Sequence, residues 1–132
     1  MIMSIEIKAP NAPQFPLPFS HALRAGDFVY VSGQVGVNPE TREVVGDTIE
    51  AQTEQSVRNI ETILQAAGLT LDHVIKVNAH LTSISDTPAY NKTYENLFSK
   101  PYPTRTTVQS GLGNYLIEID VIAYAPTRRG EG

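Results

Sequence analysis

The sequence predicts an α+β domain in which a mixed β-sheet carries two helices on one face. Two segments show the three- and four-residue apolar spacing of amphipathic helices, and several others alternate apolar and polar residues as half-buried strands do. Their order along the chain mixes helical crossovers with a local hairpin. With 132 residues and a 41% hydrophobic fraction, the chain has the size and composition of a single folded domain with one modest core.

The first part of the chain is expected to lie over the surface as an extended arm. Four prolines fall within the first eighteen residues, and because proline fixes φ and lacks a backbone N–H, residues 9–19 suit neither a helix nor a central strand. Residues 27–34 follow the turn signal Ala25-Gly26 and are rich in β-branched and aromatic side chains, which predicts a strand. Residues 36–46 have the composition of a loop.

The strongest helix prediction covers residues 48–67. Asp47 followed by Glu50 is typical of a capping box, and Gly68 stands at the position just after the helix where glycine is favoured. Apolar residues recur along this segment on one stripe, and charged residues occupy the opposite side. We therefore expect the helix to pack one face on the sheet.

The second half of the chain alternates strands and a helix. Residues 74–81 have a period of two. Asp86 is expected to cap a second helix, with Pro88 in its first turn and Pro101 beyond its end. Two further strands are predicted at 104–109 and 115–124, joined by a short glycine-containing loop, and the polar tail 126–132 is expected to fray.

Composition excludes several classes of function. A net charge of -4 and a pI near 5.3 disfavour binding to nucleic acid, and the absence of cysteine removes disulfides, thiolate catalysis and cysteine-ligated metals. His21, His73 and His80 lack the spacing of metal ligands, so no metal is expected. The chain shows neither a signal peptide nor an apolar run long enough to span a membrane, which predicts a cytoplasmic location.

The last predicted strand has an unusual second face. One face is continuously apolar, whereas the other carries Glu118 and Asp120 together with Ile122 and Tyr124. If another subunit partly covers that face, Glu118 would hold a proton more readily and could serve in general acid–base chemistry. The alternative is that both carboxylates simply point into water.

Arg105 is the second candidate. It lies on the strand expected to neighbour the last one, with Thr107 and Gln109 on the same face, so it could approach Glu118 across the pair. An arginine there can bind a substrate carboxylate with both nitrogens of its fork. The alternative is a structural ion pair between Arg105 and Glu118. A serine nucleophile at Ser32 is not expected, because the flanking glycines of a nucleophile elbow are absent.

Several segments taken together resemble the Rid family, the YjgF-like reactive intermediate deaminases. Their order and spacing over residues 9–125 make the resemblance specific. The matching stretches are Pro18-Phe19-Ser20-His21-Ala22, Val31-Ser32-Gly33-Gln34, Asn38-Pro39-Glu40-Thr41, the helix from Ala51-Gln52-Thr53 to Ala66-Ala67-Gly68, Tyr90-Asn91-Lys92-Thr93-Tyr94, Pro103-Thr104-Arg105-Thr106-Thr107-Val108 and Ile117-Glu118-Ile119-Asp120-Val121-Ile122-Ala123.

The resemblance implies one domain over residues 1–132 with a chorismate-mutase-like fold, assembled as a homotrimer with clefts between subunits. It also implies cofactor-independent hydrolysis of 2-imino acids, or their enamine tautomers, to 2-keto acids and ammonia. By the same resemblance, Arg105 would bind the substrate carboxylate and Glu118 would position or activate water. Other residues would line the cleft; these are Phe19, Ser32, Gly33, Asn91 and Thr107.

Two departures from the family pattern leave alternatives open. Many deaminating members have tyrosine where this chain has Phe19, and many have a longer loop than residues 111–115 before the last strand. A cleft altered in this way could serve a longer unsaturated amino acid such as 2-aminomuconate. The cleft could also bind a small carboxylate without turnover, and a third possibility is an interaction or chaperone-like role for the trimer surface.

Overall fold

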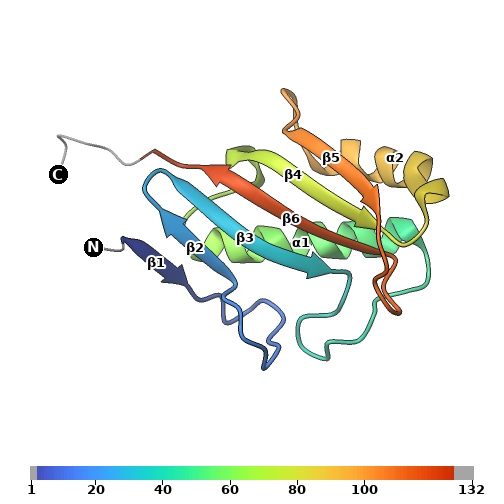
Figure 1. The fold of residues 1–132 in the computed structure, drawn as a ribbon, viewed down its shortest axis with the longest axis horizontal. Coiled ribbons are helices and arrows are strands. Elements are labelled where there is room, and N and C mark those ends of the chain that lie inside the picture. Colours follow the sequence, from blue (N-terminus) through green and yellow to red (C-terminus); the bar gives the residue numbers. More distant parts are fainter. Residues whose placement is uncertain (1–2, 127–132) are drawn as a thin grey trace.

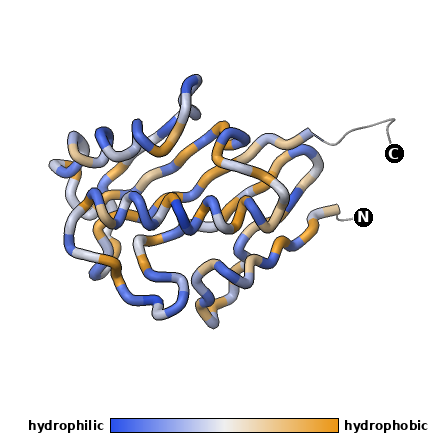
Figure 2. Tube along the Cα trace, turned by 180° about the vertical axis from the view of Figure 1, so that it is seen from behind, coloured by the Kyte–Doolittle hydropathy of each residue, from blue (hydrophilic) through white to orange (hydrophobic). Residues whose placement is uncertain are grey.

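The computed structural model describes residues 3–126 and has two layers, a six-stranded sheet and two helices that cover one of its faces (Figure 1). Both helices lie in front of the sheet when it is viewed from behind (Figure 2). This arrangement confirms the predicted α+β class. The elements are β1 (Ser4–Ile7), β2 (Ala22–Ala25), β3 (Phe28–Val35), α1 (Ile49–Ala66), β4 (Val74–Leu81), α2 (Thr87–Leu97), β5 (Thr104–Gln109) and β6 (Ile117–Tyr124), with short 3-10 turns at Leu71–His73 and Ile84–Asp86.

The strand order is β1-β2-β3-β6-β4-β5, and only the β4–β5 pair is parallel, so the sheet is mixed as predicted. The last two strands are not neighbours, which corrects the expectation on which the approach of Arg105 to Glu118 rested. Helix α2 carries the chain over to the far edge, where β5 pairs with β4 alone. Strand β6 then returns between β3 and β4 and is hydrogen-bonded on both sides.

The first two strands were not predicted, because each has only four residues and too short a pattern to show a period. Strand β2 pairs with β3 through the two-residue turn at Gly26 and Asp27, where Gly26 has a φ of 61°. The dipeptide Ala25-Gly26 is therefore the end of a strand and the start of a hairpin. The arm before β2 has no regular structure, as expected.

His21 ties this arm to the sheet. Its Nδ1 accepts a hydrogen bond from the Ala9 backbone N–H at 3.3 Å, and its Nε2 lies 2.9 Å from the Pro13 carbonyl oxygen, to which it donates in that tautomer. Both contacts span the irregular segment. The arm thus has a fixed path in spite of its lack of secondary structure.

The core lies between the helices and the sheet. The apolar faces of β3, β4 and β6 are buried, and so is the apolar stripe of α1. The alternation predicted for the last strand is confirmed, since every second residue from Ile117 to Ala123 is buried. Strand register then forces Glu118 and Asp120 onto the opposite face.

Polar residues within the buried side of α1 fix the segment that follows β3. The Ser56 hydroxyl donates to the Gln34 carbonyl at 2.7 Å, and the Asn59 amide donates to the carbonyls of Val35 at 3.1 Å and Val37 at 3.0 Å. These side chains satisfy carbonyls that a strand partner would otherwise satisfy. The sequence pattern alone gives no sign that these polar residues are buried.

Both helix starts differ in detail from the prediction. Thr48, not Asp47, is the N-cap of α1, and its hydroxyl accepts from the Ala51 N–H at 3.1 Å. Asp86 occupies the N-cap position of α2 but makes no capping hydrogen bond there. Gly68 does follow α1 with a φ of 76°, as predicted.

No helix within residues 3–126 is long and apolar enough to cross a membrane. The polar tail predicted from residue 126 falls outside the described residues from 127 onward.

Candidate active site

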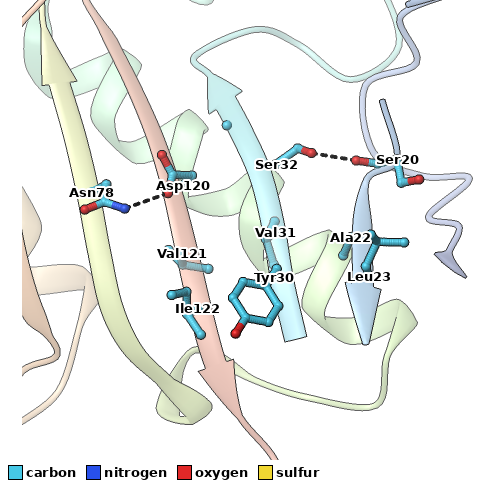
Figure 3. A pocket seen from close by; sticks show the side chains of 11 residues that line it. Ser20, Ala22, Leu23, Tyr30, Val31, Ser32, Asn78, Asp120, Val121 and Ile122 are labelled. Carbon is cyan, nitrogen blue, oxygen red and sulfur yellow. Dashed lines mark hydrogen bonds between the residues drawn. The ribbon is translucent and has the colours of Figure 1, made fainter. Parts of the chain in front are cut away.

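The open face of the sheet, defined as the face turned away from the helices, carries a polar centre. Cross-strand register places Glu118 of β6 beside His80 of β4, and Asp120 beside Asn78, whose amide donates to it at 3.0 Å. An open pocket of about 500 Å³ lies between β2, β3, β4 and β6, and Asn78 and Asp120 line it, whereas Glu118 and His80 do not (Figure 3). The pocket is shallow because helices cover only the other face.

Ser32 and Gly33 form a β-bulge at the edge of this pocket. Both residues stand opposite Asp120, so β3 has one residue more than β6 between two regular pairs. The Ser32 hydroxyl donates to the Ser20 carbonyl at 2.6 Å (Figure 3). The Ser32 N–H donates to the His21 carbonyl at 3.0 Å. The bulge therefore joins the end of the arm to the centre of the sheet.

Glu118 packs directly against Gly33. A Cβ atom on Gly33 would overlap the Glu118 Oε2 atom and would lie 2.9 Å from Cδ. Only glycine leaves room for the carboxylate in this position. The carboxylate has no hydrogen bond or ion pair within residues 3–126, so its oxygens can bind a water molecule or a substrate. Of the predicted site residues, the structure thus brings Ser32, Gly33 and Glu118 together.

Arg105 lies on edge strand β5 and points to the helix side. It is in register with Val77, which is buried beneath the helices, and its guanidinium carbon lies 5.1 Å from the Tyr90 ring centroid and 4.8 Å from that of Tyr94. Both rings belong to α2. No ion pair of Arg105 is present in the part of the chain that the structure describes, so the cation rests on aromatic faces with no acidic partner.

Burial affects the ionisation of both phenols. It raises the pKa of Tyr94 to about 12, with the neighbouring Tyr90 adding to the rise and the Arg105 charge opposing it. Burial also raises the pKa of Tyr90, whereas Arg105 and the nearby Thr107 hydroxyl lower it in part. Both phenols are therefore neutral at physiological pH and leave the Arg105 charge uncompensated.

Asn91 and Thr107 lie near Arg105, as expected. Asn91 lines a pocket of about 300 Å³ together with Arg105 and Tyr94. Thr107 shares the strand face of Arg105, and its hydroxyl is buried without a hydrogen-bond partner among the described residues. Arg105, Asn91 and Thr107 form a second group on the helix side of the sheet edge.

The two groups do not meet within one chain. Arg105 and Glu118 lie on opposite faces of the sheet, and strand β4 separates β5 from β6. The proposed structural ion pair between them is therefore wrong. The error came from treating strands adjacent in sequence as adjacent in the sheet, whereas the crossover through α2 places β5 at the edge.

Phe19 belongs to neither group. It is 47% exposed and lines a separate pocket in the arm with Phe15 and His21. Its chain neighbour Ser20 lines the open-face pocket, so Phe19 lies one residue away from it. Within one chain the arm does not close over Arg105.

Other residues of the two groups were not predicted to take part in the site. Tyr90 and Tyr94 lie within the predicted second helix, and their spacing does not reveal the contact with Arg105. His80 was expected not to bind a metal, and its Nδ1 lies 2.8 Å from the Ser110 hydroxyl. Its position beside Glu118 follows only from the pairing of β4 with β6. No group of three or more potential metal ligands exists within residues 3–126.

Comparison with known proteins decides the family. A family model described as Endoribonuclease L-PSP matches residues 9–125. The chain belongs to the Rid family. A RutC family protein of Saccharolobus solfataricus is 43% identical over 86% of this chain and 91% of that protein.

Two further members show the range of the family. A Dermatophagoides farinae protein named 2-iminobutanoate/2-iminopropanoate deaminase is 37% identical over 77% of this chain and 80% of its own length. The crystal structure of RidA from a Psychrobacter species superposes with a TM-score of 0.86 at 38% identity, covering 91% of this chain and 98% of that one. The family expected from sequence is confirmed, and so is the α+β fold with two helices on a mixed sheet.

Proposed function

We propose that this Rid-family chain hydrolyses small 2-imino acids, or their enamine tautomers, to 2-keto acids and ammonia in a cleft between subunits of a homotrimer. The observation that carries the proposal is the pair of free groups described above. Arg105 is a cation without an acidic partner, and Glu118 is a carboxylate without a hydrogen-bond donor, both within residues 3–126. The deaminase name of the mite relative supports the same reaction.

The charges suit such a substrate. The net charge of -4 repels an anion at long range, so a carboxylate has to be held locally by the Arg105 fork. The imine carbon is already electrophilic, and orientation of substrate and water can supply much of the acceleration. No cofactor is needed for this reaction, and we further propose that it takes place in the cytoplasm.

Glu118 would transfer both protons. It takes a proton from water as the water oxygen bonds to the imine carbon, and the C=N electron pair moves to nitrogen, which receives that proton. The new hydroxyl then gives its proton to Glu118, which passes it to nitrogen as the C–N bond breaks. Nitrogen leaves as ammonia and the carbon becomes a ketone, so both added hydrogens come from water.

A second copy of the chain is needed to complete the site, because one chain holds Arg105 and Glu118 on opposite faces of its sheet. The open face also exposes large apolar side chains that a second copy would cover. They include Leu23, Phe28, Tyr30 and Tyr124. A head-to-tail contact of this kind closes into a ring, as a trimer requires.

The direct test forms 2-iminobutanoate in situ with an amino-acid oxidase and follows the release of 2-oxobutanoate. Arg105→Ala and Glu118→Gln should each lower the acceleration at least tenfold, and Arg105→Lys should lose most of it because lysine lacks the fork. Lys76→Gln is the matched control, since it removes a charge from the open face without facing Glu118. No acceleration by the wild-type protein would overturn the proposal.

Mixing the two inactive variants tests the site between subunits. If Arg105 comes from one copy and Glu118 from the next, refolding Arg105→Ala with Glu118→Gln should restore about a quarter of the sites, since each site then draws two copies at random. A site within one chain would stay inactive in every mixture. Light scattering of the mixed sample should give three times the mass of the chain.

A further inference from the structure

We infer that Tyr90 and Tyr94 are positioning residues that hold the Arg105 guanidinium in the orientation needed to bind a substrate carboxylate. This inference rests on the proposed function and extends it to residues for which that proposal had no role. The contact geometry carries it, because the guanidinium carbon lies 5.1 Å and 4.8 Å from the two ring centroids.

Arg105 needs such support because of its place in the sheet. Strand β5 is an edge strand with β4 as its one partner, and Arg105 itself is exposed. A long arginine side chain in that environment samples many rotamers, and the loss of that freedom on binding weakens affinity. No acidic residue within residues 3–126 forms an ion pair that would hold it.

The two rings are themselves held firmly. Tyr90 is 0% and Tyr94 4% exposed, and their rings meet edge to face at 5.6 Å. Phe98 also stacks on Tyr94 at 4.6 Å between centroids. A buried aromatic cluster on α2 therefore presents a fixed surface to the cation.

Buried hydroxyls give a second, independent indication that a ligand binds here. The Tyr90, Tyr94 and Thr107 hydroxyls are buried and form no hydrogen bond of ordinary geometry within the described residues, although that of Tyr90 faces Arg105 and Thr107. Buried hydroxyls normally have partners. A carboxylate bound to Arg105 brings acceptors to this region, and the adjacent pocket of about 300 Å³ has room for it.

The test separates the aromatic surface from the hydroxyl groups. Tyr94→Leu removes the ring beneath the cation and should weaken the binding of 2-oxobutanoate, measured by calorimetry, by about five- to thirtyfold. Tyr94→Phe keeps the ring and should retain more affinity than Tyr94→Leu, because it removes only the hydroxyl whose proton the bound carboxylate would accept. The KM for the imine should rise in Tyr94→Leu while kcat changes little, because a loosened carboxylate clamp affects ground state and transition state alike.

Phe98→Leu is the matched control. It disturbs the same aromatic cluster, but no contact with Arg105 is found for this ring within residues 3–126, so it should lower stability without changing the affinity for 2-oxobutanoate. If Tyr94→Leu does not fold, Tyr90→Leu measured in the same way replaces it. The inference would be overturned if Tyr94→Leu, or Tyr90→Leu in its place, bound 2-oxobutanoate with wild-type affinity while Arg105→Ala had lost binding. That result would leave the proposed function intact.

Failure of the proposed function can be told apart from failure of the role assigned to the two rings. A wild-type protein that binds 2-oxobutanoate yet hydrolyses no imine would refute the proposed function, while the affinities of the Tyr94 variants would still decide the role of the rings. Because the chain has no tryptophan and six tyrosines, a tyrosine difference spectrum provides a second measure of binding. Its amplitude should fall in Tyr94→Leu and persist in Phe98→Leu.

Discussion

Substitution of Gly33 by alanine should strongly lower catalysis while leaving the fold almost unchanged. The added Cβ would overlap the Glu118 Oε2 atom and would lie 2.9 Å from Cδ and 3.0 Å from Cγ. All three atoms belong to the outer part of a flexible side chain, so the carboxylate can rotate away while the backbone stays in place. The variant therefore displaces the proposed acid–base group and little else.

The expected magnitudes for activity and stability differ widely. Moving Glu118 into another rotamer costs about 0.5–1.5 kcal/mol, and alanine in place of glycine restricts the unfolded chain and returns about 0.4–1 kcal/mol. The net change in the free energy of unfolding should stay within about 1 kcal/mol. A displacement of about 1 Å in a catalytic group can cost on the order of 100-fold in rate. We expect a loss of that size in kcat/KM.

The assay combines urea unfolding with the hydrolysis of 2-iminobutanoate. Gly111→Ala is the control, since a Cβ there has no atom within 4 Å. In a Glu118→Gln background, Gly33→Ala should add little further loss, because both changes act on the same carboxylate. Full activity in Gly33→Ala, or losses that simply multiply in the double variant, would refute the role assigned to the contact between Gly33 and Glu118.

Three further predictions concern the stability of the fold. Gly36→Ala should lower the free energy of unfolding by about 1–3 kcal/mol, because its Cβ would lie 2.6 Å from the Gln52 Cα in the backbone of α1. Gly46→Ala is the control, since its Cβ would make an ordinary 3.5 Å contact and should leave stability unchanged. Equal unfolding midpoints for the two variants would contradict the prediction. Asn59→Ala removes the amide donor of the Val35 and Val37 carbonyls. The Val35 carbonyl keeps the Val37 N–H as a donor at 2.9 Å, whereas the buried Val37 carbonyl loses its side-chain donor, so the variant should cost about 2 kcal/mol in urea unfolding, and an unchanged midpoint would argue against it. Burial raises the pKa of Tyr94 from 10.0 to about 12, so the stability that comes from keeping this phenol neutral is complete below pH 10 and is lost as the pH rises from 10 to 12. Tyr94→Phe should therefore lose less of its free energy of unfolding over that range than the wild type. Parallel plots of unfolding free energy against pH would exclude ionisation of Tyr94 as the cause.

Prediction from sequence was most accurate where local pattern governs structure. The bounds of β4 and β5 were predicted to the residue, and the buried alternation along β6 was correct, because side chains in a strand alternate faces whatever its neighbours are. The cap of α1 was misplaced by one residue, since Asp47 and Thr48 are both good capping residues and only the backbone turn selects between them.

The candidate site was predicted in its residues and not in its arrangement. Motifs singled out Arg105, Glu118 and Gly33, yet the expected proximity of Arg105 to Glu118 was wrong. The contact of Glu118 with Gly33 depends on a bulge that joins residues more than eighty positions apart. The contact of Arg105 with Tyr94 depends on how α2 packs over the sheet edge.

The sequence alone thus determined the class of the fold, its two helices and four of its six strands, its family and the side chains with useful chemistry, because these follow from composition, period and motif. The tertiary structure decided which of those side chains meet. Strand order is set by the crossover through α2 and by the burial of β6 between two partners, and these are long-range choices that no local pattern encodes. That order puts Arg105 and Glu118 on opposite faces of one sheet.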